Sequence, residues 1–226
     1  KGKWDDGKKG EYKEQGMQID YAVYMPTNVS LDAKNQFGPM ILPDYRGSLE
    51  LESKFGKLTA GKLDNLRTLD VEFGSAVVES ASGGKITIKF SRGEFKSLQG
   101  NVVVRAEFCE KLKLGLGNSV KDLDLKTSYS QAYLDVPTNL SASFNIFTSF
   151  GEFNNKTNFA IRSEKDDDER YGPKFDKTYT GNAGSGGTKY RIRAEFGEIT
   201  LGHNLQVDMS EGKDRKKDKQ KGGTVI

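Results

Sequence analysis

The stretch Leu69-Asp70-Val71-Glu72-Phe73-Gly74 decides the fold. Its apolar and polar residues alternate up to an aromatic residue, which a residue without a side chain follows. The same aromatic-small pair returns along the chain, at Phe37-Gly38, Phe55-Gly56, Phe90-Ser91, Phe108-Cys109, Tyr129-Ser130, Phe150-Gly151 and Phe196-Gly197. Successive pairs, Phe73-Gly74 included, lie 18, 18, 17, 18, 21, 21 and 46 residues apart. A period of about 20 residues is typical of a repeat architecture, in which each unit buries its apolar face against its neighbours.

The residues before each aromatic predict β-strands. Leu69 and Val71 precede Phe73, and Ile86 and Ile88 precede Phe90. This alternation has the period of two that a strand requires. Some units have two extra residues before the aromatic, as between Leu125 and Tyr129, and an insertion of two leaves the aromatic on the same face.

The small residue after each aromatic predicts a tight corner. Glycine reaches positive φ without steric cost, and a small side chain lets stacked corners approach at the strand spacing of about 4.8 Å. We expect the aromatic rings themselves to belong to the core and not to form a binding stripe. On that interpretation Phe73→Ala costs about 3–5 kcal/mol as a cavity mutation, and Phe175→Ala costs far less.

The period places the domain boundaries. It predicts one all-β body, a right-handed single-stranded β-helix (β-solenoid) with repeats of about 17–21 residues, over residues 17–205. Residues 1–16 are a charged N-terminal arm and residues 206–226 a charged C-terminal tail. A long loop excursion at about 160–189 interrupts the pattern, and Tyr190 to Leu201 form a last rung. The phrase Pro-Thr-Asn at residues 26–28 and again at 137–139 predicts two equivalent turns and is consistent with a duplicated half-solenoid.

Composition narrows the function classes. The chain of 226 residues carries 35 basic and 32 acidic residues and a net charge of +3, which is typical of a solvated surface and argues against a nucleic-acid partner. No apolar run approaches the ~18 residues of a membrane-spanning helix. Nothing at Lys1 resembles a signal peptide, so an exported protein would have lost its leader before this sequence begins.

The order of these motifs is similar to that in a known family. Repeated strands ending in Phe-Gly, an early Pro turn, and a Gly-rich loop before Tyr190-Arg191-Ile192-Arg193-Ala194-Glu195-Phe196-Gly197 resemble the exported bacterial proteins, known from Bacteroidetes, that are labelled adhesins by analogy. The resemblance covers residues 17–205. It implies a right-handed single-stranded β-helix and an exported protein of the periplasm, outer membrane or cell surface. Ser91, Cys109 and Ser130 depart from the family's glycine.

No residue pattern indicates catalysis or a cofactor. His203 has no Ser nucleophile motif or second ligand near it in the sequence, and we interpret it as a surface or capping residue. The acidic run Asp166–Glu169 lacks the Gly punctuation of a calcium loop, and Gly181–Gly187 lacks the Gly-Lys-Thr order of a phosphate loop. Cys109 is interpreted as a small corner residue. We therefore expect no enzyme, no catalytic residues, no cofactor and no metal site.

The remaining expectation is a binding scaffold at the cell envelope for an unknown surface glycan or protein, with oligomers possible. The predicted binding wall centres on the outward residues Glu72, Lys89 and Arg105. An alternative stays open, because β-helices also include lyases and hydrolases that act on polysaccharides through paired carboxylates or basic residues on one outer wall. Asp70 and Glu72 are outward carboxylates of this kind.

Overall fold

The computed structural model describes residues 19–164 and 175–210, and in these ranges it is all-β. The predicted arm at residues 1–16, most of the tail at 206–226 and the acidic run at 166–169 lie outside the described residues. The strands form one long, unclosed and mostly parallel sheet that is compatible with a β-solenoid. No helix in the described ranges is long and apolar enough to cross a membrane.

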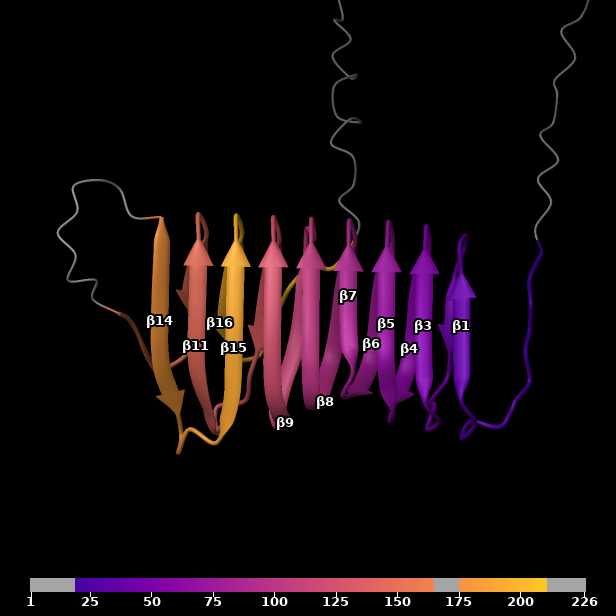
Figure 1. Cartoon of the computed structure of the whole chain (residues 1–226), viewed down its shortest axis with the longest axis horizontal. Coiled ribbons are helices and arrows are strands. Elements are labelled where there is room, and N and C mark those ends of the chain that lie inside the picture. Colours follow the sequence, from indigo (N-terminus) through magenta and orange to yellow (C-terminus); the bar gives the residue numbers. More distant parts are fainter. Residues whose placement is uncertain (1–18, 165–174, 211–226) are drawn as a thin grey trace, which may run out of the picture.

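The sheet folds into two facing walls. Figure 1 shows the strands of the first wall side by side, in the order β1–β3–β5–β7–β8–β9–β15–β11–β14. β13 follows β14 in this wall. Its strands are β1 Leu31–Asn35, β3 Leu49–Lys54, β5 Leu66–Glu72, β7 Lys85–Lys89, β15 Thr188–Glu195, β11 Ala142–Ser149, β14 Asp176–Ala183 and β13 Ala160–Ser163.

The second wall consists of strands that follow the corners. They are β2 Met40–Leu42, β4 Lys57–Leu63, β6 Ser75–Ser82, β10 Gln131–Asp135, β16 Glu198–Gly202 and β12 Glu152–Asn155. The long strands β8 Arg92–Glu107 and β9 Leu112–Ser128 belong to both walls. Their first halves pair in the second wall and their second halves in the first, with register shifts between the halves of β8. We call a first-wall strand and the second-wall strand that follows it one level.

The core lies between the walls, where the alternation predicted it. In β3 every second residue is buried, and Leu69, Ile86 and Leu114 are fully enclosed. The corresponding polar residues point outward. Because each level supplies only a few apolar side chains, burial depends on the levels above and below.

The last level in sequence is not last in space. β15 pairs with β9 on one side and β11 on the other, and β16 pairs with β10 and β12. The chain therefore returns and inserts its final level between two earlier ones. The prediction that Tyr190 to Leu201 form a terminal rung is wrong in position.

The predicted excursion also differs from what the structure shows. β14 pairs antiparallel with β11, and β13 pairs antiparallel with β14, so the described parts of residues 160–189 extend the first wall. These two strands cover the β11 edge. Both Pro-Thr-Asn phrases form turns, as predicted, and at the second the Leu140 N–H donates to the Pro137 carbonyl at 3.2 Å.

Candidate functional site

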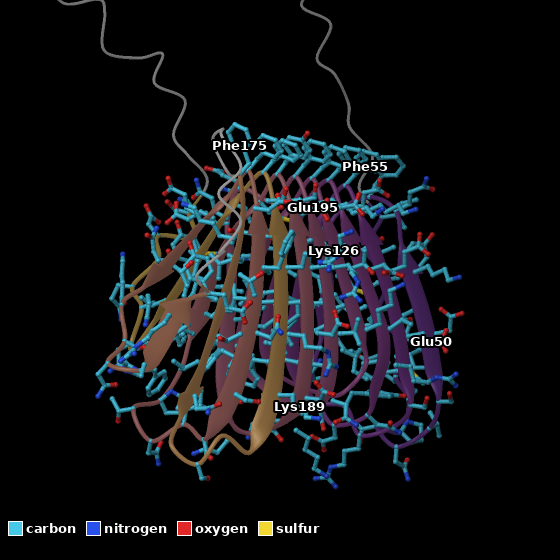
Figure 2. All side chains as sticks on the ribbon, turned by 60° about the vertical axis from the view of Figure 1, so that its left-hand side comes forward. Glu50, Phe55, Lys126, Phe175, Lys189 and Glu195 are labelled. Carbon is cyan, nitrogen blue, oxygen red and sulfur yellow. The ribbon has the colours of Figure 1, made fainter. Side chains whose placement is uncertain are left out.

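A continuous stack of aromatic rings runs along the corner between the two walls. Nine rings of the described chain take part, and neighbouring centroids are 4.4 to 5.4 Å apart. Their order is Phe37, Phe55, Phe73, Phe90, Phe108, Tyr129, Phe196, Phe150 and Phe175. Figure 2 shows the row along the upper rim, with Phe55 and Phe175 labelled. We call this row the aromatic ridge.

The backbone of the aromatic residues turns their rings out of the core. Phe55, Phe73 and Phe90 have φ of 52°, 52° and 48°, and the other corner aromatics from Phe108 to Phe196 have similar values. This left-handed conformation reverses the direction of the side chain relative to the preceding strand. The rings are consequently about half exposed, with 46% for Phe73. The prediction that they belong to the core is wrong.

The small residue after each ring lets the corners stack closely. A Cβ on Gly74 would overlap the carbonyl oxygen of Gly56, and one on Gly56 would overlap that of Gly38. Close stacking was predicted correctly. Positive φ was assigned to the wrong residue, because among the corner glycines only Gly38 adopts it.

Serine corners solve the same problem with a hydrogen bond. Ser91 Oγ accepts the Gly74 N–H at 2.9 Å and donates to the Lys89 carbonyl at 2.6 Å. Ser130 Oγ similarly accepts the N–H of Cys109 at 2.9 Å. A side-chain oxygen here satisfies a backbone donor of the preceding corner.

Stacking determines which part of each ring meets solvent. Between Phe55 and Phe196 the interplanar angles are 1° to 8°, so each ring covers its neighbours' faces and presents its edge outward. Half of the area of a Phe side chain, summed over nine rings, makes roughly 900 Å² of contiguous apolar surface. The largest apolar patch of a typical monomer is about 300–600 Å² and is often functional.

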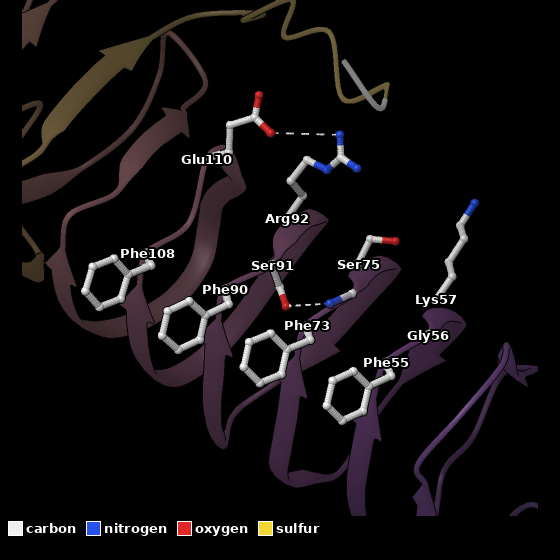
Figure 3. Close-up of a pocket in the computed structure, with 11 residues that line it drawn as sticks. Phe55, Gly56, Lys57, Phe73, Ser75, Phe90, Ser91, Arg92, Phe108 and Glu110 are labelled. Atoms are coloured by element: carbon white, nitrogen blue, oxygen red, sulfur yellow. Dashed lines mark hydrogen bonds and ion pairs between the residues drawn. The ribbon is translucent and has the colours of Figure 1, made fainter. Parts of the chain in front are cut away.

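A groove runs beside the ridge on the side of the second wall (Figure 3). Its volume is about 760 Å³. One bank consists of Phe55, Phe73, Phe90 and Phe108, and the floor contains Gly56, Gly74 and Ser91. Lys57, Ser75, Arg92 and Glu110 form the opposite bank, so the groove is apolar on one side and polar on the other, with two cations and one carboxylate.

The chain after β16 crosses the second wall toward this groove. The Leu205 N–H donates to Asp135 Oδ1 at 3.2 Å, and Lys111 Nζ donates to the Asp208 carbonyl at 2.7 Å. Arg92 donates to the Ser210 carbonyl at 2.9 Å and lies 4.0 Å from Glu110. These contacts hold the Arg92 guanidinium at the edge of the groove.

The predicted binding residues lie on the outer face of the first wall, near the ridge. Glu72 and Lys89 are paired neighbours on β5 and β7, and Arg105 lies on β8. Glu72 contacts Lys54 at 3.6 Å, Lys89 contacts Glu107 at 3.4 Å, and Arg105 contacts Asp124 at 2.8 Å. The wall brings the three residues close together, but it engages each charge with an opposite one.

Sequence reasoning missed a basic row on the same face. Arg105, Lys126 and Arg193 are successive register partners on β8, β9 and β15, and the Arg193 guanidinium lies 5.1 Å from the centroid of Phe147. Arg105 and Lys126 can be aligned from the spacing of the aromatic corners. Arg193 cannot, because its level is inserted out of chain order.

His203 and Cys109 each contact a backbone carbonyl of the fold. His203 Nδ1 lies 2.7 Å from the Val136 carbonyl, and its ring meets Phe159 edge-on at 5.2 Å. Cys109 is buried, and burial raises the pKa of its thiol to about 11. The Gly-rich segment forms the turn between β14 and β15, with Gly184 and Gly186 at positive φ.

Metal-ligating side chains do not gather in the described ranges, where no three His, Cys, Asp or Glu residues form a group that could hold an ion. Comparison with known proteins found no match to any family model, curated protein or solved structure.

Proposed function

We propose that the chain is a right-handed single-stranded β-helix of the adhesin-like type, and that it serves as a non-catalytic binding scaffold of the bacterial cell envelope. Two parallel walls, joined at stacked corners, support this architecture. The aromatic ridge carries the proposal, because solvent-exposed rings in an unbroken row exceed what a monomer needs for its own core.

The ridge favours a protein partner over a glycan. Sugars bind aromatic side chains across the ring face, and here the faces of all but the terminal rings are covered by neighbours about 5 Å away. Ring edges instead offer a ridged apolar strip. Apolar side chains from an extended segment can pack against such edges.

The charged bank specifies the partner further. Lys57 and Arg92 face the ridge across the groove, and Lys111 follows Arg92 at the next level. Carboxylates suit the Lys57 ammonium and the Arg92 guanidinium, although Arg92 also lies 4.0 Å from Glu110, and Arg can bind a carboxylate bidentately. We therefore assign the groove to an extended protein segment in which apolar and acidic residues alternate.

A labelled peptide of alternating leucine and glutamate tests this assignment. We expect its fluorescence polarisation to rise with the protein, and a leucine-lysine peptide to bind at least tenfold more weakly. Phe73→Ser with Phe90→Ser should abolish binding, and Lys57→Glu should weaken it. Circular dichroism and thermal unfolding identify variants that retain the fold.

The first-wall hypothesis supplies the matched control. Charge reversal at Glu72, Lys89 and Arg105 leaves the ridge intact and should leave peptide binding unchanged. If that variant loses binding and the ridge variant retains it, the binding site is the first wall. Equal binding of both peptides, or binding to a panel of oligosaccharides that the ridge variant retains, would also refute the assignment.

A further inference from the structure

The two ends of the sheet differ in their strands, although in the described chain both present strands that pair on one side only, since β13 pairs only with β14 and β12 only with β16. On the first wall, antiparallel β14 and β13 cover the edge that β11 would otherwise present. At the opposite end, β1 pairs only with β3 and β2 only with β4 in the described chain. The end residues Leu31, Ala33, Met40 and Leu42 pack against the core and are only partly buried. An open strand edge is a template for pairing with another strand.

The described residues before β1 add no strand to this edge, although Met25 packs against the core. Residues 19–26 form no strand, and Figure 1 shows them passing outside β1. Tyr21, Val23 and Tyr24 are 88%, 81% and 95% exposed.

We propose that the open end binds the open end of a second copy of this chain, with β1 antiparallel to β1 and β2 antiparallel to β2. A single twofold axis can serve both walls. Ala33 lies four residues before the corner residue Phe37, and Ile41 lies four residues after it, so the two lie at the same height on facing walls. An axis through both positions sets each residue opposite its own copy.

The backbone of β1 is oriented for this pairing. The Leu31 N–H donates to the Ser48 carbonyl toward β3. Since successive residues of a strand point their amides to opposite sides, Asp32 and Lys34 direct N–H and C=O toward the open edge. With Ala33 on the axis, Asp32 of one copy forms a hydrogen-bonded pair with Lys34 of the other, twice.

The side chains of β1 are self-complementary in the same register. Asp32 and Lys34 both lie on the outer face, 3.9 Å apart and more than half exposed. Antiparallel pairing about Ala33 sets each Asp32 opposite Lys34 of the second copy. Opposite charges directly across an antiparallel pair are stabilising, and like charges are destabilising.

The second wall restricts the contact to a closed dimer. Pro39 and Pro43 flank Ile41 and would face each other across the axis, and proline donates no hydrogen bond. Pairing there is confined to Ile41, whose side chain is 77% exposed and would meet its own copy. Because both copies use the same end, the contact closes as a twofold dimer and cannot propagate into a fibre.

Charge exchange at β1 tests the dimer through its molar mass. Light scattering coupled to size exclusion, over a range of concentration, should show the full chain rising from 25.0 kDa to twice that mass. Asp32→Lys and Lys34→Asp each set like charges opposite each other and should raise the dissociation constant about tenfold. The double variant restores the opposite charges and should dimerise like the original chain.

Mixing the two single variants gives an independent check, because a Lys-Lys strand opposite an Asp-Asp strand should form a heterodimer. Asp70→Lys, on the exposed face of β5 away from the edge, is the matched control and should dimerise normally. A full chain that stays monomeric over the same range of concentration refutes the proposal. A dimer that neither single variant weakens, or that Asp70→Lys weakens equally, also refutes it.

Discussion

Substitution of Phe73 tests whether its ring lies on the exposed ridge or in the core, because the two positions predict different losses of stability. About half of its side chain is buried, chiefly against Phe55 and Phe90, whose centroids lie 5.1 and 5.0 Å away. That corresponds to about 100 Å², or about 2.5 kcal/mol at 25 cal/mol per Å². Water fills the space left by the ring, so no cavity cost is added. Phe73→Ala should therefore cost about 2–2.5 kcal/mol, while Phe95→Ala, at a fully buried position, should cost about 3–5 kcal/mol.

Glycine at the same position tests the sign of the difference in stability between the Gly and Ala variants. Phe73 has φ of 52°, and an L-residue with a Cβ is strained there by about 1–2 kcal/mol. Glycine removes that strain, so Phe73→Gly should retain about 1 kcal/mol more stability than Phe73→Ala. In an ordinary strand the order is reversed. Urea unfolding followed by circular dichroism measures all three variants. A Gly variant less stable than the Ala variant, or a Phe73→Ala loss equal to that of Phe95→Ala, would refute the reasoning.

Three other changes test separate parts of the fold. Gly74→Ala should cost about 1–3 kcal/mol, because its Cβ would overlap the preceding corner. Gly74→Ser should cost less, because Ser91 shows that a serine can occupy a corner and form a hydrogen bond there. Equal unfolding midpoints for the Ala and Ser variants would contradict this. Burial raises the pKa of Cys109 from 9.0 to about 11. The stability that the protonated thiol contributes is therefore full below pH 9 and is lost as the pH rises toward 11. In Cys109→Ala, the free energy of unfolding should fall less between pH 9 and pH 11 than in the original chain. Arg105→Ala should cost no more than about 1 kcal/mol, because its ion pair with Asp124 is partly exposed, and a larger loss in the same urea assay would show that the pair is structural.

Local patterns predicted the strands and the corners, but they could not predict which way the rings point. Phe73 is in phase with the inward residues Leu69 and Val71, so a period of two extends the core to the ring. A positive φ at the aromatic breaks that phase in one residue. Bulky residues rarely adopt this conformation, and nothing in a single strand announces it.

The units interpreted as having two extra residues show a second feature that the alternation of apolar residues does not predict. Thr127 and Thr148 are fully buried at inward positions, where the apolar pattern predicts no polar residue. Thr127 pairs in register with Ala106, so the level contains no extra residue before the ring. The hydroxyls of both threonines have no hydrogen-bond partner among the described residues, so their burial carries a polar cost that a sequence pattern does not anticipate.

The groove residues were within reach of the sequence. Lys57, Ser75 and Arg92 each stand two residues after a corner aromatic, and aligning the corners would have placed them in one row. They were missed because the rings were assigned to the core, which left no reason to search beside them. The inserted level is different in kind, since only long-range pairing determines that β15 lies between β9 and β11.

The ridge is continuous at the inserted level, where the order of the levels in space differs from their order in the sequence. Tyr129 stacks on Phe196 at 4.8 Å, and Phe196 on Phe150 at 5.1 Å, although 67 and 46 residues of chain separate them. These spacings match those between levels that follow each other directly. Ring position is therefore set by strand register and by the left-handed corner of each level, and not by the connection between levels. Phe175, which directly precedes the antiparallel strand β14, stacks on Phe150 at 4.4 Å. The ridge therefore continues where the strands are no longer parallel. A row that three different kinds of connection all continue is in keeping with the proposal that the whole row is a binding surface.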